Sequence, residues 1–201
     1  MFLGGVMNTI AFVILAIVVV LIAAGAFFYA RRRHSEKLRQ QFGPEYNRAI
    51  DQYGDQRKAE AELAAREKRV RELNIRELTA NEQNRFAENW KRMQALFVDE
   101  PSRAVSDADS LVKELMHTRG YPVGDFEQRA ADVSVNHPNV VKNYRAAREI
   151  ADRNKSGKAT TEDLRQAMVH YRSLFEELLE APATTAQPRT AEPISPKEVT
   201  R

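Results

Sequence analysis

The sequence predicts an all-α protein: one N-terminal transmembrane helix, a charged helix, a small helical bundle and a disordered C-terminal tail. Three observations predict this class. Residues 1–30 carry no charged side chain, and residues 181–201 hold four of the eight prolines. Between His34 and Glu180, apolar residues recur at the spacing of amphipathic helices. The predicted boundaries are residues 1–30, 31–78, 79–180 and 181–201.

The first segment has the length and composition of a membrane span. Ile10 to Tyr29 is an almost unbroken apolar run that ends in aromatic residues. About 20 apolar residues in a helix cross a hydrocarbon core of roughly 30 Å. A cleavable signal peptide is the alternative, because Ala24-Gly25-Ala26 resembles a cleavage site. A signal peptide has a basic start and a shorter apolar region, so the sequence favours a permanent anchor.

A basic cluster follows the span directly. Its members are Arg31, Arg32, Arg33, Lys37 and Arg39, and no Lys or Arg precedes the span. Positively charged flanks stay in the cytoplasm, so we expect a single-pass protein of the cell (inner) membrane with a cytoplasmic C-terminal domain. The cluster can also attract anionic lipid headgroups, at about 1 kcal/mol per basic residue. A secreted or envelope-facing domain is the alternative.

The charged segment before the bundle is predicted to be helical and solvated. Gln41-Phe42-Gly43-Pro44 marks a break, after which a helix runs from Pro44 to about Asn74, with Tyr53-Gly54 as an optional interruption. Glu62–Arg66, Glu67–Arg71 and Glu72–Arg76 have the i,i+4 spacing that stabilises isolated helices. Apolar residues are sparse from Ala59 to Leu78, which indicates a solvated stalk or a weak coiled coil, and leaves a homo-oligomer possible.

The apolar stripes that follow predict a bundle of four or five helices. Phe86, Trp90, Met93 and Phe97 share one face of a helix that Thr79 or Asn81 would cap. The next helix starts at Pro101 and would be terminated by Gly120. A short helix follows its cap at Asp125, and two more helices start at Pro138 and at about Thr161. These stripes would close one hydrophobic core.

Composition argues against several functions. There is no cysteine, which excludes disulfides, thiolate zinc sites and cysteine nucleophiles. A net charge of +3 argues against a dedicated nucleic-acid binder. Phosphate-binding, dinucleotide-binding and zinc-protease motifs are absent from the sequence. We therefore expect no enzyme activity, no cofactor and no metal site.

Two motifs could carry chemistry, and both have simpler explanations. Asp152 to Gly157 matches the first half of a calcium-binding loop, with Asp163 at its twelfth position. Basic residues within the match favour a helix end at Gly157 and a capping box from Thr160 to Asp163 instead. Ser110-Leu111-Val112-Lys113 has the form of a serine acylase motif, but its companion motifs are missing.

Three strings of the soluble region resemble a known group. They are Arg119-Gly120-Tyr121-Pro122, Asp125-Phe126-Glu127 and the run from Thr161 to Arg172. The chain resembles uncharacterised bacterial single-pass membrane proteins, over the span and most of the soluble region. The resemblance implies a bacterial cell membrane and carries no activity.

The loop from Arg119 to Phe126, together with His137-Pro138, is the candidate binding surface. Tyr, Pro, Gly and Arg concentrated there suit either a rigid connector or a recognition surface. We expect a partner-binding edge at Arg119, Tyr121, Asp125 and Arg129. The predicted function is a non-catalytic module that scaffolds or recruits a protein partner, with a self-associating structural membrane protein as the alternative.

Overall fold

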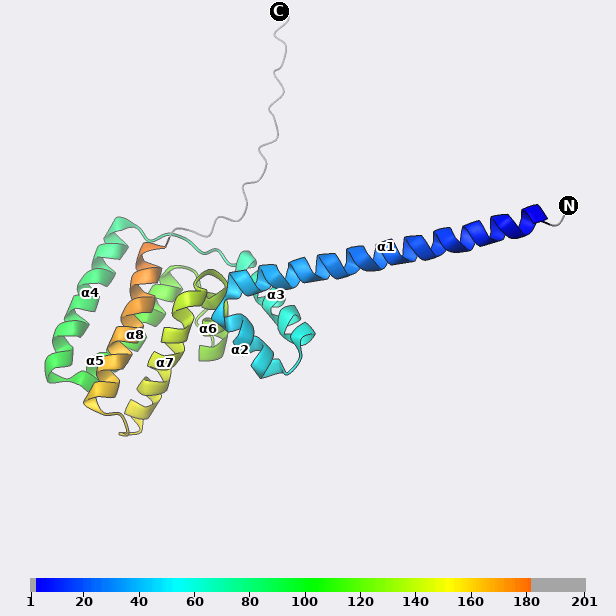
Figure 1. The fold of residues 1–201 in the computed structure, drawn as a ribbon. Coiled ribbons are helices and arrows are strands. Elements are labelled where there is room, and N and C mark those ends of the chain that lie inside the picture. The colour runs from blue at the N-terminus through cyan, green and yellow to red at the C-terminus, as the bar shows by residue number, and fades with distance from the viewer. Residues whose placement is uncertain (1–2, 182–201) are drawn as a thin grey trace, which may run out of the picture. The chain divides into compact units, whose positions relative to one another are not determined.

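The computed structural model describes residues 3–181, and the side chains of residues 15–181. The predicted disordered tail lies outside the described residues from residue 182 onward. Within residues 3–181 the chain forms eight helices and no strand, so the all-α prediction is confirmed (Figure 1). Val133-Ser134-Val135, an alternation that could have marked a strand, lies within a helix.

The first helix, α1, is a single continuous element from Leu3 to Phe42. It is long and apolar enough to cross a membrane, and none of its 18-residue apolar window is buried inside the protein. Its large apolar side chains from Leu15 to Tyr29 are exposed, as in Val20 and Phe28 at 65% and 68%. A core helix would bury these side chains, so the part of α1 from Leu15 to Tyr29 does not belong to a soluble core, whereas Leu38 and Phe42 near its end are buried.

The predicted break after the first helix is confirmed. Gly43 adopts φ +48°, and Pro44 occupies the first turn of α2, which spans Pro44–Tyr53. Gly54 then ends α2 in the left-handed conformation, with φ +65°, and its N–H donates to the carbonyl of Ile50. The optional interruption at Tyr53-Gly54 is therefore real, and the helix expected from Pro44 to Asn74 is two helices.

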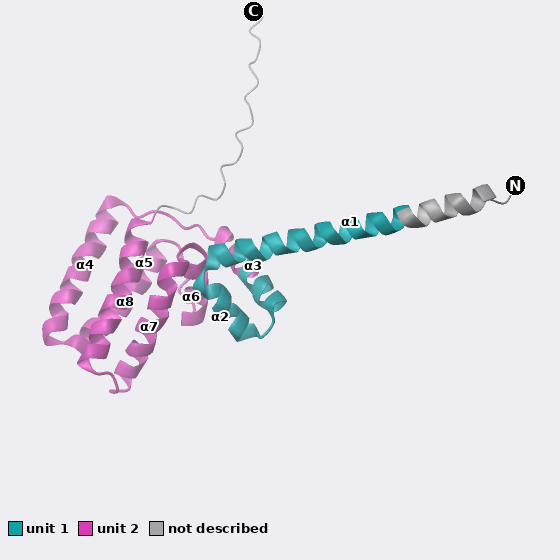
Figure 2. Ribbon diagram, viewed as in Figure 1, with its two compact units in different colours: residues 1–64 teal, residues 65–201 magenta. Residues whose placement is uncertain are grey.

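The chain divides into two compact units, residues 1–64 and residues 65–201 (Figure 2). The division falls inside α3, which spans Gln56–Glu72. In unit 1, the hydroxyl of Tyr46 donates to Glu60 over 2.7 Å. Gln56 donates to the same carboxylate over 2.8 Å, so α2 is tied to the start of α3.

The prediction of a solvated stalk over residues 59–78 is wrong for one face of α3. Ala59, Leu63 and Val70 are buried, and so are the charged residues Glu60 and Arg66. The apolar residues are few, but they recur at helical spacing and therefore share one buried face. The prediction was wrong because it rested on the high proportion of charged residues in the segment. The helix also ends at Glu72, before the expected Asn74.

Unit 2 is a bundle of four long helices with one short helix attached. The long helices are α4 (Ala80–Asp99), α5 (Pro101–Thr118), α7 (Pro138–Lys155) and α8 (Thr161–Glu180). Helix α8 packs against α5 and α7, α4 packs against α5, and the short α6 (Phe126–Asn136) packs against α7. The core includes a stacked pair, Trp90 and Phe175, with ring centroids 4.7 Å apart.

Side-chain caps start three of these helices where the sequence places them. Thr79 and Glu82 form a capping box at the start of α4, and Thr160 and Asp163 form another at the start of α8. The Asp125 carboxylate accepts from the Gln128 N–H at the start of α6. Of the two candidate caps for α4, the structure selects Thr79.

A tight backbone contact joins the end of α5 to the segment that follows α3. The Arg76 N–H donates to the Arg119 carbonyl over 2.9 Å. Gly120 lies beside this bond with φ +96°, and a Cβ atom there would be 2.3 Å from the carbonyl oxygen of Asn74. Only glycine fits this position without displacing backbone.

Candidate functional site

Three of the four predicted partner-binding side chains lie in the interior of unit 2. Arg119 and Tyr121 are 1% and 2% exposed, and Arg129 is also buried. Asp125 is exposed, but its carboxylate caps α6. The predicted binding edge is therefore wrong for Arg119, Tyr121 and Arg129, whose side chains are buried and bonded to internal polar groups. Of the two interpretations of the loop, the structure fits the rigid connector.

Arg119 holds the C-terminal end of α8. Its Nη1 donates to the carbonyls of Leu178 and Ala181, over 2.6 and 2.7 Å. The last carbonyls of a helix have no partner within the helix, so a buried guanidinium supplies the missing donors. Burial lowers the pKa of Arg119 below its ordinary value.

Tyr121 and Arg129 make comparable internal contacts. The amide of Asn136 donates to the Tyr121 hydroxyl over 3.3 Å, and burial raises the pKa of Tyr121. Arg129 donates to the Tyr144 hydroxyl over 3.3 Å and also to the Gly124 carbonyl. Both side chains therefore fix the connector between α5 and α6.

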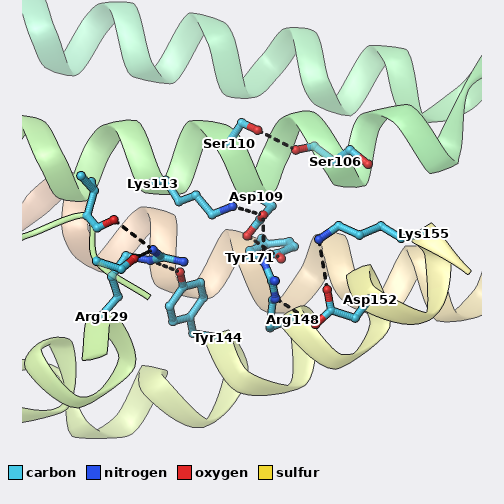
Figure 3. Close-up of polar contacts among 12 residues, drawn as sticks. Ser106, Asp109, Ser110, Lys113, Arg129, Tyr144, Arg148, Asp152, Lys155 and Tyr171 are labelled. Atoms are coloured by element: carbon cyan, nitrogen blue, oxygen red, sulfur yellow. Dashed lines mark hydrogen bonds and ion pairs between the residues drawn. The ribbon is translucent and has the colours of Figure 1, made fainter. Parts of the chain in front are cut away.

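A second group of polar side chains lies between α5, α7 and α8. Figure 3 shows Asp109, Arg148 and Tyr171 directed toward one another. The Tyr171 hydroxyl donates to Asp109 over 3.0 Å, Lys113 forms an ion pair with the same carboxylate, and Arg148 lies 3.5 Å from it. Burial and the negative charge of Asp109 raise the pKa of Tyr171. A tyrosine held in its neutral form and bound to a carboxylate stabilises packing and is a poor acid or base near neutral pH.

The serine acylase pattern is explained by this network. Lys113 is bound to Asp109, and the Ser110 hydroxyl donates to the Ser106 carbonyl over 3.0 Å (Figure 3). An acylating serine would need its hydroxyl near a base that can take its proton. Here each of the two side chains has a structural partner.

The carboxylates of the calcium-loop pattern also have structural partners. Asp152 pairs with Arg148 and Lys155 over 2.9 and 3.1 Å. Asp163 pairs with Arg153 over 2.9 Å and completes the capping box with Thr160, as the simpler interpretation predicted. In the part of the chain with described side chains, no group of three or more His, Asp or Glu residues is placed to hold a metal ion.

An open groove on the surface of unit 2 is the strongest candidate for a binding site. Its volume is about 900 Å³, and it lies between the C-terminal half of α8 and the junction of α6 with α7. Val135, Val140 and Val169 provide apolar surface. The remaining lining residues are polar or terminal: Asn136, His137, Arg172, Ser173, Glu176, Glu177, Glu180 and Ala181. We call this feature the α8 groove.

The α8 groove is acidic on the α8 side. Glu176, Glu177 and Glu180 line it, against one basic residue, Arg172, which donates to Glu176 over 2.7 Å. Glu177 lies 3.0 Å from Nδ1 of the buried His137. Burial lowers the pKa of His137, although Glu177 opposes the shift. Three carboxylates against one arginine give the groove a net negative charge whether or not His137 is protonated.

The three glutamates occupy an unfavourable place on their helix. They lie at its C-terminal end, and the last turn of α8 contains no basic residue. The C-terminal end of a helix carries partial negative charge, so carboxylates there are destabilising. Natural proteins break the local rules of helix stability mainly at functional or strained sites, so these glutamates make the groove a candidate site.

The predicted membrane-flanking residues lie together on the last third of α1. Arg32, Arg33, Lys37 and Arg39 are exposed, and Arg31 is half-buried. The Arg33 guanidinium lies 5.6 Å from the ring centre of Tyr29, and that of Arg39 lies 5.3 Å from the ring of Tyr46. The cluster therefore continues the apolar part of α1 without a break in the helix.

Sequence reasoning did not find the α8 groove. Its surface combines residues 135–140 with residues 169–181, which are distant in sequence. The available signal was the set of glutamates at the end of a predicted helix without a compensating basic residue. Comparison with protein-family models, curated proteins and solved structures finds no match to this chain.

Proposed function

We propose that the chain is a single-pass membrane protein whose unit 2 is a non-catalytic module that binds a basic segment of a partner protein in the α8 groove. The observation that carries this proposal is the groove itself, which combines apolar valines with three carboxylates. Lysine and arginine side chains have apolar stems and charged ends, so they match such a surface. The C-terminal end of a helix carries partial negative charge, so it attracts cations, as the carboxylates do.

The membrane part of the proposal rests on α1 and its basic flank. An exposed apolar helix of this length is stable in lipid, because all its backbone hydrogen bonds are internal. The flank of Arg31, Arg32, Arg33, Lys37 and Arg39 favours a cytoplasmic unit 2 and contact with anionic lipid. With the resemblance described above, this suggests the cell membrane of a bacterium.

Orientation is tested with a reporter fused after Arg201. A reporter that works only in the cytoplasm is expected to be active, and one that works only outside is expected to be inactive. Replacing Arg31, Arg32 and Arg33 by Glu is expected to lower the cytoplasmic signal, because arginine directs topology. An active external reporter on the unaltered chain would show that unit 2 faces the cell envelope.

Binding is tested with the full chain in phosphatidylcholine nanodiscs. The probe is a fluorescein-labelled 12-residue peptide of Lys, Ala and Val, compared with one in which Glu replaces Lys. We expect the Lys peptide to bind and the Glu peptide not to bind. The double variant Glu177→Gln with Glu180→Gln should weaken binding about tenfold, because two partly exposed charge contacts are lost.

The matched control is Glu88→Gln with Glu149→Gln. Both glutamates are exposed, lie on α4 and α7, and do not line the groove. This control changes the net charge by the same amount as the groove variant. Equal affinity for both double variants would mean that the peptide responds to overall charge, and the groove would not be its site.

A further inference from the structure

We propose that the α8 groove is occupied by the chain's own C-terminal segment, residues 182–201, with Arg189 against the glutamates of α8. This inference goes beyond the proposed function, because it concerns a contact within one chain and needs no partner protein. The segment would compete with any basic partner for the same surface.

The segment starts at the groove, and its starting point is fixed. Ala181 lines the groove, and Arg119 donates to the carbonyls of Leu178 and Ala181. Ala181 has left the helix, with φ −62° and ψ +134°. Pro182 follows, and a residue before proline favours this extended conformation. The chain therefore leaves α8 at one edge of the groove, in a defined direction.

Arg189 is close enough along the chain to reach every glutamate of the groove. It follows Ala181 by eight residues, which span at most about 26 Å when extended. Glu176 precedes Ala181 by five residues, or about 7.5 Å along the helix axis. A short tether gives an effective concentration in the millimolar range, so that even a weak contact is populated.

The positive charge of Arg189 is complementary to the negative charge of the groove. The groove presents Glu176, Glu177 and Glu180 at the negative end of α8, with Arg172 bonded to Glu176. Arg189 is the first basic residue that the sequence provides after α8. Its charge would add to that of Arg172, because three carboxylates line the groove against this one arginine.

The composition of the segment suits a shallow surface with valines. Residues 182–188 contain Pro, Ala, Thr and Gln and no charge. Proline restricts the chain to extended conformations, so binding costs less conformational entropy than it would for a flexible segment. Small side chains of this kind can lie over the more exposed valines, Val140 and Val169, while Arg189 meets the glutamates.

The test uses the absence of cysteine from the chain. Two double variants of the full chain are prepared in nanodiscs: Ser173→Cys with Thr190→Cys, and Ser110→Cys with Thr190→Cys. Ser173 lines the groove, whereas Ser110 is an exposed residue of α5 that does not. Oxidation is expected to form the intramolecular disulfide at least tenfold faster in the first variant. Tryptophan fluorescence of the reduced proteins confirms that both are folded.

Charge reversal tests the role assigned to Arg189. Arg189→Glu alone, or Glu180→Arg alone, is expected to slow the Ser173–Thr190 crosslink severalfold, and the two together should restore it. Lys197→Glu should leave the rate unchanged. Equal crosslinking rates for the Ser173 and Ser110 variants would overturn the proposal. A crosslink only between two chains would also overturn it, since the occupant would be a second copy. None of these readouts uses the basic peptide, so the proposed function and this inference can fail separately.

Discussion

Replacing Asp109 by alanine is expected to lower the free energy of unfolding of unit 2 by about 3 kcal/mol. The carboxylate is buried and is shared by Tyr171, Lys113 and Arg148. Its removal leaves the Tyr171 hydroxyl without an acceptor and leaves two cations near a buried surface. This loss of unfolding free energy is at the lower end of the range for breaking a buried ion pair. The reason is that the side chains of Lys113 and Arg148 are 32% and 22% exposed and can reach water.

Denaturant unfolding followed by tryptophan fluorescence measures this effect. The chain contains one tryptophan, Trp90, which stacks on Phe175 inside unit 2. The control is Asp107→Ala, two residues away, where an exposed carboxylate lies 3.7 Å from Arg103. This control should cost less than about 1 kcal/mol. Similar losses for Asp109→Ala and Asp107→Ala would show that the buried network contributes little.

Replacing Gly120 by alanine is expected to cost more than about 3 kcal/mol, from two additive causes. The backbone conformation, with φ +96°, is one that alanine rarely adopts. The new Cβ atom would also lie 2.3 Å from the backbone oxygen of Asn74, and backbone cannot move aside as a flexible side chain can. The hydrogen bond from the Arg76 N–H to the Arg119 carbonyl would break as a result.

Two other glycines separate these causes. Gly157 has φ +66° but open space around its Cβ position, so Gly157→Ala should cost about 1 kcal/mol from conformation alone. Gly124 has an ordinary φ, and its Cβ would meet Gln128 at 3.8 Å, so Gly124→Ala should be nearly neutral. Thermal or denaturant unfolding of the three variants should give this ranking. A cost for Gly120→Ala no larger than that for Gly157→Ala would exclude the clash.

Local features of the fold could be predicted from the sequence because they depend on neighbouring residues. Gly43-Pro44 ends one helix and starts the next, and Thr79 and Thr160 cap helices through residues three positions later. Glycine, proline and short hydroxyl side chains act on their own backbone, so their effect does not depend on the rest of the fold.

Features that depend on distant residues could not be predicted in the same way. Arg119 is buried because the carbonyls of Leu178 and Ala181 need donors, and nothing near Arg119 in the sequence shows that need. An arginine between Thr118 and Gly120 looks like a surface residue of a loop. The α8 groove likewise exists only after residues 135–140 and 169–181 are brought together. Surface charge and burial are properties of the assembled bundle.

The uninterrupted length of α1 sets a distance. Forty residues from Leu3 to Phe42 give a rod of about 60 Å, roughly twice the hydrocarbon thickness of a bilayer. With the bilayer boundary near Ala30, the twelve residues to Phe42 extend about 18 Å outward, past a headgroup layer of about 5–8 Å. The joint at Gly43 would then stand in water, clear of the lipid. In a bilayer, the length of α1 beyond Ala30 would fix the distance between the membrane surface and Gly43, where the chain first changes direction.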